Sequence, residues 1–259
     1  MSKPVILLVP GAWHEPSCFS PLASYLVKHG YTVEGISLPS VNSSPPHPNF
    51  DGDVDAIAST IRKYADQGSD IVAFFHSYGG IPGSSACRGL LKIDREAQGK
   101  TGGVKHLIFC SAHAVDEGVS VMDNLGGEPL PWFNLSEDGK TSKLADETSA
   151  ELFYNDIDDE KVLAELVGNV KPQSYGAFWS KSSYAAWMDV DSTYVHCERD
   201  NAMPVAFQRE MVANVRRAVE ERGANGRMHD VTLDASHSSF VSRPEEVGLI
   251  VRRVAGEKV

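Results

Sequence analysis

The chain has 259 residues, of which 42% are hydrophobic and 23% are charged, and these are ordinary proportions for a globular protein. Lysine and arginine total 24 against 35 acidic residues, so the formal net charge is −11. This acidic balance argues against duplex nucleic acid or an anionic membrane as the main partner, because both select for basic patches. No apolar run approaches the roughly 20 residues that span a bilayer. The first apolar run, residues 4–9, is too short for the core of a secretory signal.

The four cysteines lie far apart and form no Cys-x-x-Cys pair; they are Cys18, Cys87, Cys110 and Cys197. A disulfide framework is not expected in a chain this long and this poor in cysteine. We therefore expect reduced thiols and a cytoplasmic protein.

The first 115 residues alternate between strand and helix patterns. The continuous apolar run Val5–Val9 is typical of a strand buried on both faces of a parallel sheet. The other segments expected as strands are 31–36, 70–75 and 104–110, and those expected as helices are 19–29, 54–64 and 78–91. Residues 38–48, rich in proline and serine, are expected to form a mobile surface loop. Strand–helix alternation predicts a parallel sheet with helices on both faces.

The alternation stops between residues 116 and 189, a stretch with many aromatic residues and no apolar strand run. Within it, Asp138-Gly139 predicts a tight hairpin turn, and residues 150–167 have a helical pattern. The alternation then resumes, with strands expected at 192–197 and 228–233 and helices at 205–222 and 244–254. We expect an α/β fold whose six-stranded, mostly parallel sheet comes from residues 1–115 and 190–259. Residues 116–189 would be an inserted lid.

A sharp strand-to-helix turn is predicted where Phe74-Phe75-His76 runs into Ser77-Tyr78-Gly79-Gly80. Such a turn would hold the Ser77 hydroxyl clear of the strand end, as a nucleophile requires. Small residues two positions before and two positions after the serine normally relieve crowding there. Gly79 is small, as required, but Phe75 is not. The turn alone therefore does not distinguish a nucleophile from a Ser-x-Gly sequence that occurs by chance.

Polar side chains follow each of the last two expected strands. His237 comes just after the last strand, and Glu198 and Asp200 come just after the strand before it. Catalytic groups in open α/β sheets gather beyond the carboxyl ends of the strands, where Ser77 is also expected. Serine, acid and histidine occur here in one of the chain orders that catalytic triads use. Together these sites predict a catalytic triad.

The sequence resembles a small α/β-hydrolase over essentially its whole length. It is most similar to the esterase and hydroxynitrile lyase branch that includes the plant methylesterases. In that branch the first apolar strand ends in a short glycine-containing loop followed by histidine, as in Val-Pro-Gly-Ala-Trp-His at residues 9–14. The insertion of that branch carries an Asp-Gly-Lys hairpin followed by helices, like residues 138–140 here. The usual leading antiparallel hairpin is missing.

The resemblance implies a role for each residue of the triad. Ser77 would be the nucleophile, His237 the general base and later the acid, and Asp200 the acid that orients the imidazole. Asp200 matches better than Glu198, because the family's spacing from the acid to a proline is met by Asp200 and Pro204.

The resemblance also implies an oxyanion hole formed by the backbone N–H groups of Ala12 and Tyr78. No His-x-His or His-Glu-x-x-His spacing indicates a metal, and no Gly-x-Gly-x-x-Gly turn follows the first strand. We therefore expect neither a metal nor a cofactor.

The aromatic residues of the insertion can form the core of a lid, face the cleft, or do both. We expect a substrate pocket lined by Trp13, His14, Trp132, Phe178, Trp179 and Trp187. His113 is a further candidate for the mouth of the pocket, whereas His76 is expected to point into packing. The histidines expected to be ordinary surface or strand residues are His47, His106 and His229.

These features predict a cofactor-free serine hydrolase that cleaves a carboxylic ester or lactone through an acyl-enzyme. Hydroxynitrile lyases of the branch carry a threonine in the first loop and a lysine after the catalytic histidine, where this chain has Gly11 and Ser238. Carbon–carbon bond cleavage, cyclisation and a ligand receptor on the same scaffold stay open.

The expected partner is a small-molecule ester or lactone rather than a nucleic acid or a membrane, and a homodimer is open. The insertion contains no arginine, and its lysines lie among polar residues. An anionic substrate would therefore lack a bidentate partner there. We expect a preference for neutral, apolar acyl groups.

Overall fold

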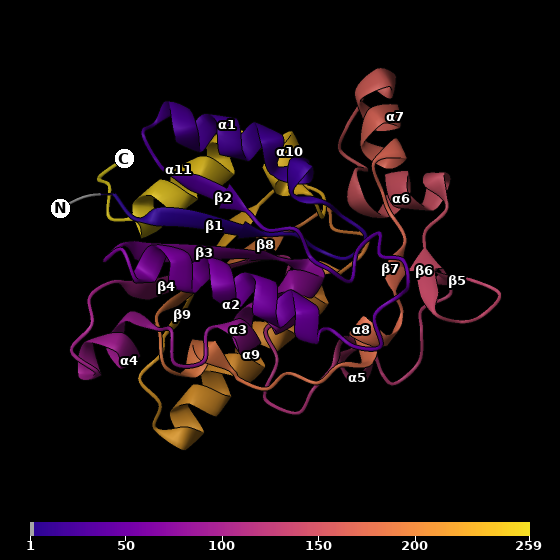
Figure 1. Ribbon diagram of the computed structural model, residues 1–259. Helices are drawn as coiled ribbons and strands as arrows, with labels where there is room; N and C mark the ends of the chain where they lie inside the picture. The colour runs from indigo at the N-terminus through magenta and orange to yellow at the C-terminus, as the bar shows by residue number, and fades with distance from the viewer. Residues whose placement is uncertain (1–2) are drawn as a thin grey trace.

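The computed structural model describes residues 3–259 and contains a six-stranded sheet in the order β2-β1-β3-β4-β8-β9 (Figure 1). Every neighbouring pair of strands in this sheet is parallel. Its strands are β1 (Val5–Val9), β2 (Val33–Gly35), β3 (Asp70–His76), β4 (Gly103–Cys110), β8 (Ser192–Cys197) and β9 (Met228–Leu233). The predicted α/β fold with a parallel six-stranded sheet is confirmed, although β2 is shorter than the pattern at 31–36 suggested.

Helices and short 3-10 helices follow the strands. They are η1 (Pro16–Phe19), α1 (Ser20–Lys28), α2 (Asp51–Ala65), η2 (Ser77–Gly79), α3 (Gly80–Ala86), α4 (Lys92–Ala97), α9 (Val205–Arg222), α10 (Ser239–Ser242) and α11 (Pro244–Val254). One helix was expected over residues 78–91, but α3 ends at Ala86 and a turn with Gly89 at φ +69° leads into α4. The reason is that glycine adopts this left-handed conformation without steric cost, so the chain can turn there.

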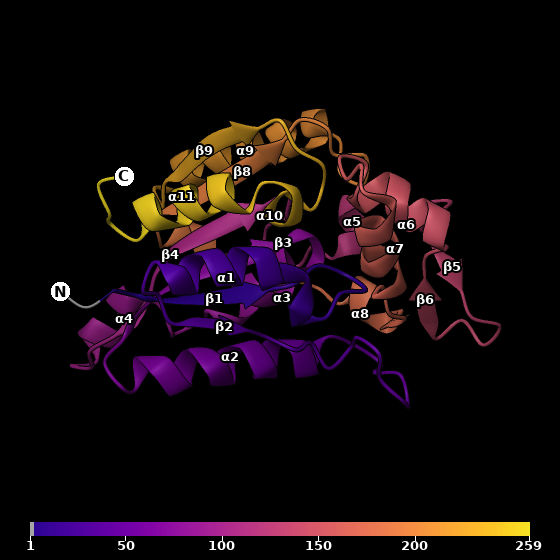
Figure 2. The ribbon, with the colours of Figure 1, turned by 90° about the horizontal axis from the view of Figure 1, so that it is seen from above.

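Alternate residues of the central strands pack on opposite faces of the sheet. Leu7 and Val9 of β1 belong to one hydrophobic cluster, together with apolar residues of α2, α3 and α9. Ile6 and Leu8 belong to the other cluster, together with residues of α1, α10 and α11. These two sets of helices lie on opposite sides of the sheet (Figures 1 and 2). The two-residue period of a strand explains why a continuous apolar run is buried on both faces.

Most of residues 116–189, called the insertion below, lies beyond the carboxyl ends of the strands (Figures 1 and 2). Its last residues run back past α3, where the Ala186 N–H donates to the Ser84 hydroxyl, to the start of β8. Its elements are α5 (Val121–Asn124), β5 (Asn134–Leu135), β6 (Thr141–Lys143), α6 (Asp146–Phe153), α7 (Glu160–Gly168), β7 (Gln173–Ser174), α8 (Gly176–Trp179) and η3 (Ala186–Met188). The strands β5 and β6 form an antiparallel hairpin, as expected, with Gly139 at φ +68° in the turn. A small three-stranded sheet, β5-β6-β7, was not expected.

The prediction of a single helix over residues 150–167 is wrong. Residues 154–159 separate α6 from α7, and α7 starts at its own N-cap. The Asp159 side chain accepts hydrogen bonds from the backbone N–H groups of Lys161 and Val162. An aspartate that caps a new helix in this way satisfies donors that a continuous helix would not leave free.

Residues 38–48 were expected to form a mobile surface loop, and the structure corrects this for their first part. Ser40 is buried, and its carbonyl oxygen accepts a hydrogen bond from the Ser174 N–H. The Asn42 N–H donates to the Pro172 carbonyl oxygen in the same region. The segment is therefore attached to β7 of the insertion through the backbone.

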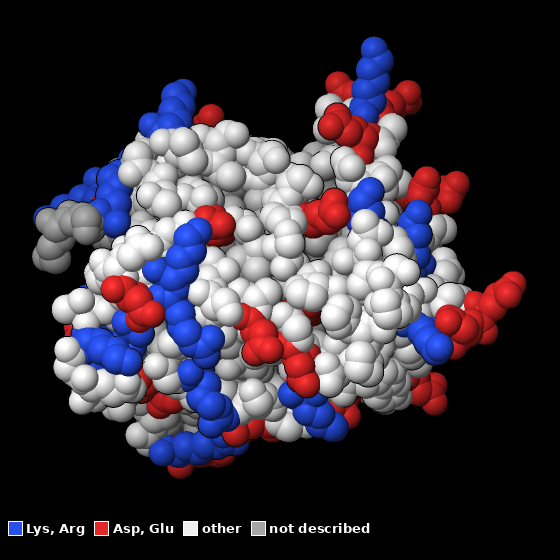
Figure 3. Space-filling view, in the orientation of Figure 1, with Lys and Arg blue, Asp and Glu red and all other residues white. Residues whose placement is uncertain are grey.

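Basic side chains on the face shown in Figure 3 stand beside acidic ones, and acidic side chains are prominent on the insertion. Within residues 3–259, no helix combines the length and the apolar character needed to cross a membrane.

Candidate active site

Ser77 lies at the turn between β3 and α3, where the backbone takes an unusual conformation. Its φ angle is +49°, in the left-handed region that a residue with a Cβ atom rarely adopts. A Cβ atom on Gly79 would lie 2.5 Å from the Pro10 carbonyl oxygen, so only glycine lets the turn approach the end of β1. Strain of about 1–3 kcal/mol at such a residue persists only where the surrounding structure imposes it.

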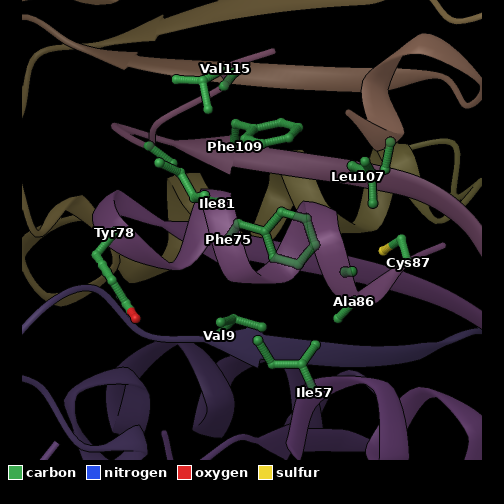
Figure 4. Packing of buried hydrophobic residues seen from close by; sticks show 14 of the residues in the cluster. Val9, Ile57, Phe75, Tyr78, Ile81, Ala86, Cys87, Leu107, Phe109 and Val115 are labelled. Atoms are coloured by element: carbon green, nitrogen blue, oxygen red, sulfur yellow. The ribbon is translucent and has the colours of Figure 1, made fainter. Parts of the chain in front are cut away.

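Phe75, which lacks the small size expected two positions before the serine, is accommodated on the face of the sheet that α3 covers. Its side chain is fully buried and packs edge-on against Phe109, with the ring centroids 5.5 Å apart (Figure 4). A Cβ atom on Gly83 of α3 would lie only 2.6 Å from the Phe75 ring. The small residue that relieves crowding therefore lies in the helix instead of the strand.

The first loop, after β1, comes close to the serine turn. A Cβ atom on Gly11 would lie 2.9 Å from the Cβ atom of Ser77 and 2.7 Å from Nδ1 of His76. Gly11 therefore allows the loop to place Ala12 beside the serine, and both Ala12 and Ser77 line the same cavity.

His237 and Asp200 form a buried pair at the carboxyl ends of β9 and β8. The His237 Nδ1 lies 2.8 Å from Oδ2 of Asp200, and the exposed fractions of the two side chains are 2% and 0%. His237 lines the cavity that contains Ser77. A buried carboxylate on Nδ1 holds the imidazole in the tautomer that presents Nε2 as a proton acceptor.

Three further donors hold the Asp200 carboxylate in place. The backbone N–H groups of Ala202 and Met203 donate to Oδ1 at 2.9 and 2.7 Å. The Gln208 amide, fully buried in α9, donates to Oδ2 at 3.0 Å. The other candidate acid, Glu198, is 48% exposed and pairs with Arg209, so the structure places Asp200 beside His237 instead.

The backbone N–H groups of the first loop and the serine turn differ in their hydrogen-bond partners. The Trp13 N–H donates to Oε1 of Gln173 at 2.8 Å, so this donor is already engaged. The residues expected to supply the oxyanion hole, Ala12 and Tyr78, both line the cavity with Ser77.

A buried carboxyl group, Asp53 of α2, lies beneath these two segments. It accepts hydrogen bonds from the Tyr78 hydroxyl at 2.6 Å and from the Ser40 hydroxyl and N–H at 2.6 and 2.8 Å. The Ser40 hydroxyl in turn accepts from the Gln173 amide at 2.9 Å, and Gln173 holds the Trp13 N–H. This network, called the Asp53 network below, joins the serine turn, the first loop and the insertion.

Burial dominates the ionisation of the Asp53 network. It raises the pKa of the Asp53 carboxyl above its ordinary value, and the hydrogen bonds from Ser40 and Tyr78 oppose this shift. Burial and the adjacent carboxyl raise the pKa of the Tyr78 hydroxyl well above its ordinary value. The hydroxyl therefore stays protonated and keeps donating to Asp53.

The cavity at the carboxyl ends of the strands has a volume of about 270 Å³ and a mostly apolar wall. Among residues 3–259, no lysine, arginine, aspartate or glutamate lines it. The lining residues are Ala12, Trp13, Ser77, Tyr78, His113, Val121, Asn124, Leu125, Leu130, Trp132, Phe133, Phe153, Phe178, Ala202, Met203, Pro204, Phe207 and His237. Such a wall suits a neutral ligand of modest size.

Three of the residues expected to line the pocket, Trp13, Trp132 and Phe178, do line this cavity. The expectation needs correction for the other three, His14, Trp179 and Trp187. Trp179 ends α8 with an exposed fraction of 42%, and Trp187 is buried elsewhere, with its indole N–H donating to the Val115 carbonyl oxygen at 3.0 Å.

His14 lies behind the cavity wall. Its Nε2 is 2.7 Å from the Tyr154 hydroxyl and its Nδ1 is 2.6 Å from the Ala12 carbonyl oxygen. Burial lowers the pKa of His14 to about 4. His14 therefore supports the Ala12 loop as a neutral group, and it borders a separate cavity of about 340 Å³.

The other histidines have various surroundings. His76 is buried with its ring centroid 4.6 Å from that of His237, which agrees with a packing role, and burial lowers its pKa well below the ordinary value. His106 is a partly buried strand residue whose Nε2 lies 2.9 Å from the Thr193 hydroxyl. His113 does line the cavity.

Several residues of the site gave no signal in the sequence pattern. Gln208 and Phe207 lie in the first turn of α9, just after Pro204. The one sequence signal for them is that a predicted helix begins shortly after a candidate acid. Asn124 and Asp53 each lie in or near a helix with no motif around them. Within the part of the chain that the structure describes, no group of three or more His, Cys, Asp or Glu side chains could hold a metal ion.

A serine on a strained turn, at the carboxyl edge of a parallel sheet whose later strands carry an acid and a histidine, defines the α/β-hydrolase class. Residues 6–248 match the model of the alpha/beta hydrolase family, and the chain belongs to that family. A relative from Aspergillus novofumigatus, named alpha/beta hydrolase nvfD, is 33% identical over 260 residues, which is 100% of this chain and 99% of the relative.

Solved structures with similar folds include a pyrethroid hydrolase from Sphingobium faniae JZ-2, with a TM-score of 0.72 and 20% identity over 99% of both chains. Another is a polyneuridine aldehyde esterase, with a TM-score of 0.75 and 18% identity over 98% of this chain and 100% of the other. At these identities the likeness concerns the fold alone.

Proposed function

We propose that this protein is a serine hydrolase that cleaves a neutral carboxylic ester or lactone through an acyl-enzyme. The observation that carries the proposal is the buried Asp200–His237 pair, 2.8 Å apart, whose histidine lines the cavity that also contains Ser77 on a strained turn. A buried acid beside a histidine and a strained serine is the arrangement that activates a hydroxyl as a nucleophile.

The proposed reaction gives each of these groups a role. Ser77 Oγ attacks the carbonyl carbon while His237 Nε2 takes the hydroxyl proton, and Asp200 stabilises the imidazolium that forms. The oxyanion accepts hydrogen bonds from the backbone N–H groups of Ala12 and Tyr78. His237 then gives its proton to the leaving alkoxide, and afterwards it activates a water molecule that attacks the acyl-enzyme.

The cavity wall supports a neutral substrate, because no acidic or basic side chain of the described part of the chain, other than its two histidines, lines it. A carboxylate or phosphate on the substrate would lose its hydration without gaining a cation in return. Aromatic and aliphatic side chains of the insertion would contact the acyl or alcohol portion, so the insertion would act as a lid over the site.

Hydroxynitrile lyase chemistry fits the site less well. A Cβ atom at position 11 would lie 2.9 Å from the Ser77 Cβ atom, so the first loop leaves no room for a threonine in its present position. The lysine of such enzymes is replaced by Ser238, which is buried and uncharged. A cyanide leaving group would have no cation beside it.

The proposal is tested by an activity screen over p-nitrophenyl esters of graded chain length, methyl esters and lactones. We expect turnover of at least one neutral ester or lactone, abolished in Ser77→Ala. Hydrolysis that survives this substitution would exclude Ser77 as the nucleophile. Binding of such compounds with no turnover by the unaltered protein would favour a receptor on the hydrolase scaffold.

A further inference from the structure

The cavity contains a polar pair that the proposed reaction does not use. Apart from Ser77, His237 and aromatic side chains, the polar residues of the lining are His113 and Asn124. Most of the remaining wall is apolar. A polar pair in such a wall costs free energy unless it has hydrogen-bond partners, so its purpose calls for a physical explanation.

The contact between the two side chains determines where His113 carries its proton. His113 Nδ1 lies 2.8 Å from Nδ2 of Asn124, and the same Nδ2 lies 3.5 Å from Sδ of Met211. An amide nitrogen only donates, so Nδ1 of His113 accepts and bears no proton. A neutral imidazole with Nδ1 unprotonated carries its proton on Nε2.

His113 also stays neutral over the ordinary pH range. Burial, aided by the nearby His237, lowers its pKa to about 3. The His113 side chain therefore presents Nε2–H as an uncharged hydrogen-bond donor, and this donor belongs to a residue that lines the cavity.

The backbone fixes His113 relative to the nucleophile. The His113 N–H donates to the carbonyl oxygen of Ser77 at 3.1 Å. A Cβ atom on Gly80 would lie 2.3 Å from the His113 carbonyl oxygen, so the chain at residue 113 packs directly against the start of α3. The donor is thus held at a constant position from Ser77, as a specificity contact requires.

We propose that His113 is a substrate-binding residue whose Nε2–H donates a hydrogen bond to a second oxygen of the substrate, separate from the carbonyl that Ser77 attacks. The preferred substrate class is then a neutral ester or lactone with a further ketone, ether or hydroxyl oxygen. This inference rests on the proposed function, because it places the same ligand class in the same cavity.

An all-hydrocarbon acyl chain would offer the Nε2–H no acceptor in a mostly apolar pocket. One net hydrogen bond of this kind favours the oxygenated ligand by up to about tenfold in affinity. The proposal therefore predicts discrimination by the position of an oxygen atom and not by charge.

The test measures binding to Ser77→Ala protein, which avoids turnover. The ligands are ethyl hexanoate and its 3-oxo, 4-oxo and 5-oxo analogues, titrated calorimetrically. We expect at least one oxo isomer to bind about tenfold more tightly than the parent ester. In Ser77→Ala combined with His113→Phe, that advantage should disappear.

The matched control is Ser77→Ala combined with His106→Phe. His106 is a partly buried histidine of β4 that does not line the cavity. This control should keep the oxo advantage. Asn124→Leu in the Ser77→Ala background provides a second variant: without the amide donor the tautomer is no longer fixed, so the advantage should shrink. Equal affinity for all four ligands, or an advantage that survives His113→Phe, would overturn the proposal.

A measurement on the unaltered protein does not depend on any variant folding. Nitrogen-15 chemical shifts of His113 should show the Nε2–H tautomer between pH 5 and pH 8, and the Nδ1–H tautomer would contradict the proposed donor. If the protein binds oxo esters preferentially but hydrolyses none, the proposed function fails and the role of His113 stands. If it hydrolyses plain and oxo esters alike, the proposed function stands and the role of His113 fails.

Discussion

The Asp53 network links the segments on both sides of the proposed oxyanion hole, so replacing Asp53 by leucine tests how far it holds the site. The substitution removes the acceptor for three donors, namely the Tyr78 hydroxyl and the hydroxyl and N–H of Ser40. Leucine has a similar size, and it leaves the burial of α2 against the sheet intact.

The expected cost follows from these contacts. A buried donor without a partner costs about 1–3 kcal/mol, so three such donors would cost about 3–9 kcal/mol. Both hydroxyls can rotate toward other acceptors, and removal of a carboxyl group whose pKa is raised by burial relieves a desolvation penalty. We expect a net loss of about 3 kcal/mol in the free energy of unfolding.

Activity should fall as well, because the Tyr78 side chain no longer anchors the turn that carries its backbone N–H. Loss of one oxyanion donor costs about 2.7–4 kcal/mol in the transition state, so a displaced donor should lower kcat by up to about 1000-fold. KM should change little, since the cavity wall stays the same.

The assay is urea unfolding at pH 7 with parallel ester kinetics. Asp55→Leu is the control, because Asp55 lies on the same helix with an exposed side chain. Equal unfolding midpoints and equal kcat for Asp53→Leu and Asp55→Leu would refute the reasoning.

Three further predictions concern the acid, the effect of pH and the substrate. Asp200→Asn should lower kcat by about 10⁴-fold, by analogy with other triad aspartates, whereas Glu198→Gln should cost far less; steady-state kinetics would contradict this if the ranking were reversed. Because the pKa of His14 is lowered to about 4 in the folded state, His14 becomes protonated in the unfolded chain at a higher pH than in the folded protein. About 3 kcal/mol of stability should therefore be present at pH 7 and be lost between about pH 6.5 and pH 4, and a flat profile in urea unfolding would count against it. Among paired esters of equal length, kcat/KM should be higher for an acyl chain that ends in methyl than for one that ends in carboxylate. Each methylene added before the pocket is full should stabilise the transition state by up to about 0.8 kcal/mol. Preference for the carboxylate would reveal a cation in the site.

The fold could be predicted from the sequence because its determinants are local. The apolar run Val5–Val9 and the later strand runs are each long enough to be recognised, and parallel strands bring their carboxyl ends to one edge. That topology brings Ser77, His237 and the acidic residues after β8 to one edge, whereas the choice of Asp200 over Glu198 came from the spacing that the family resemblance implies.

The insertion could not be predicted to the same extent, because its structure depends on contacts between distant residues. Trp179 and Trp187 belong to the same aromatic-rich stretch as Phe178, yet only Phe178 lines the cavity. Gly83 relieves the crowding around Phe75 from the next helix, and no spacing rule of the turn indicates this. Similarly, Asp53 is one of several acidic residues in its helix, and only the tertiary structure buries it.

The central claim is that Ser77 is the nucleophile, and covalent labelling tests it most directly. The intact mass of the unaltered protein is measured after reaction with a fluorophosphonate probe, together with that of Ser77→Ala. The account predicts one equivalent of label on the unaltered protein, mapped to Ser77 by peptide analysis, and none on the variant. Label on another residue, or one equivalent on Ser77→Ala, would contradict it.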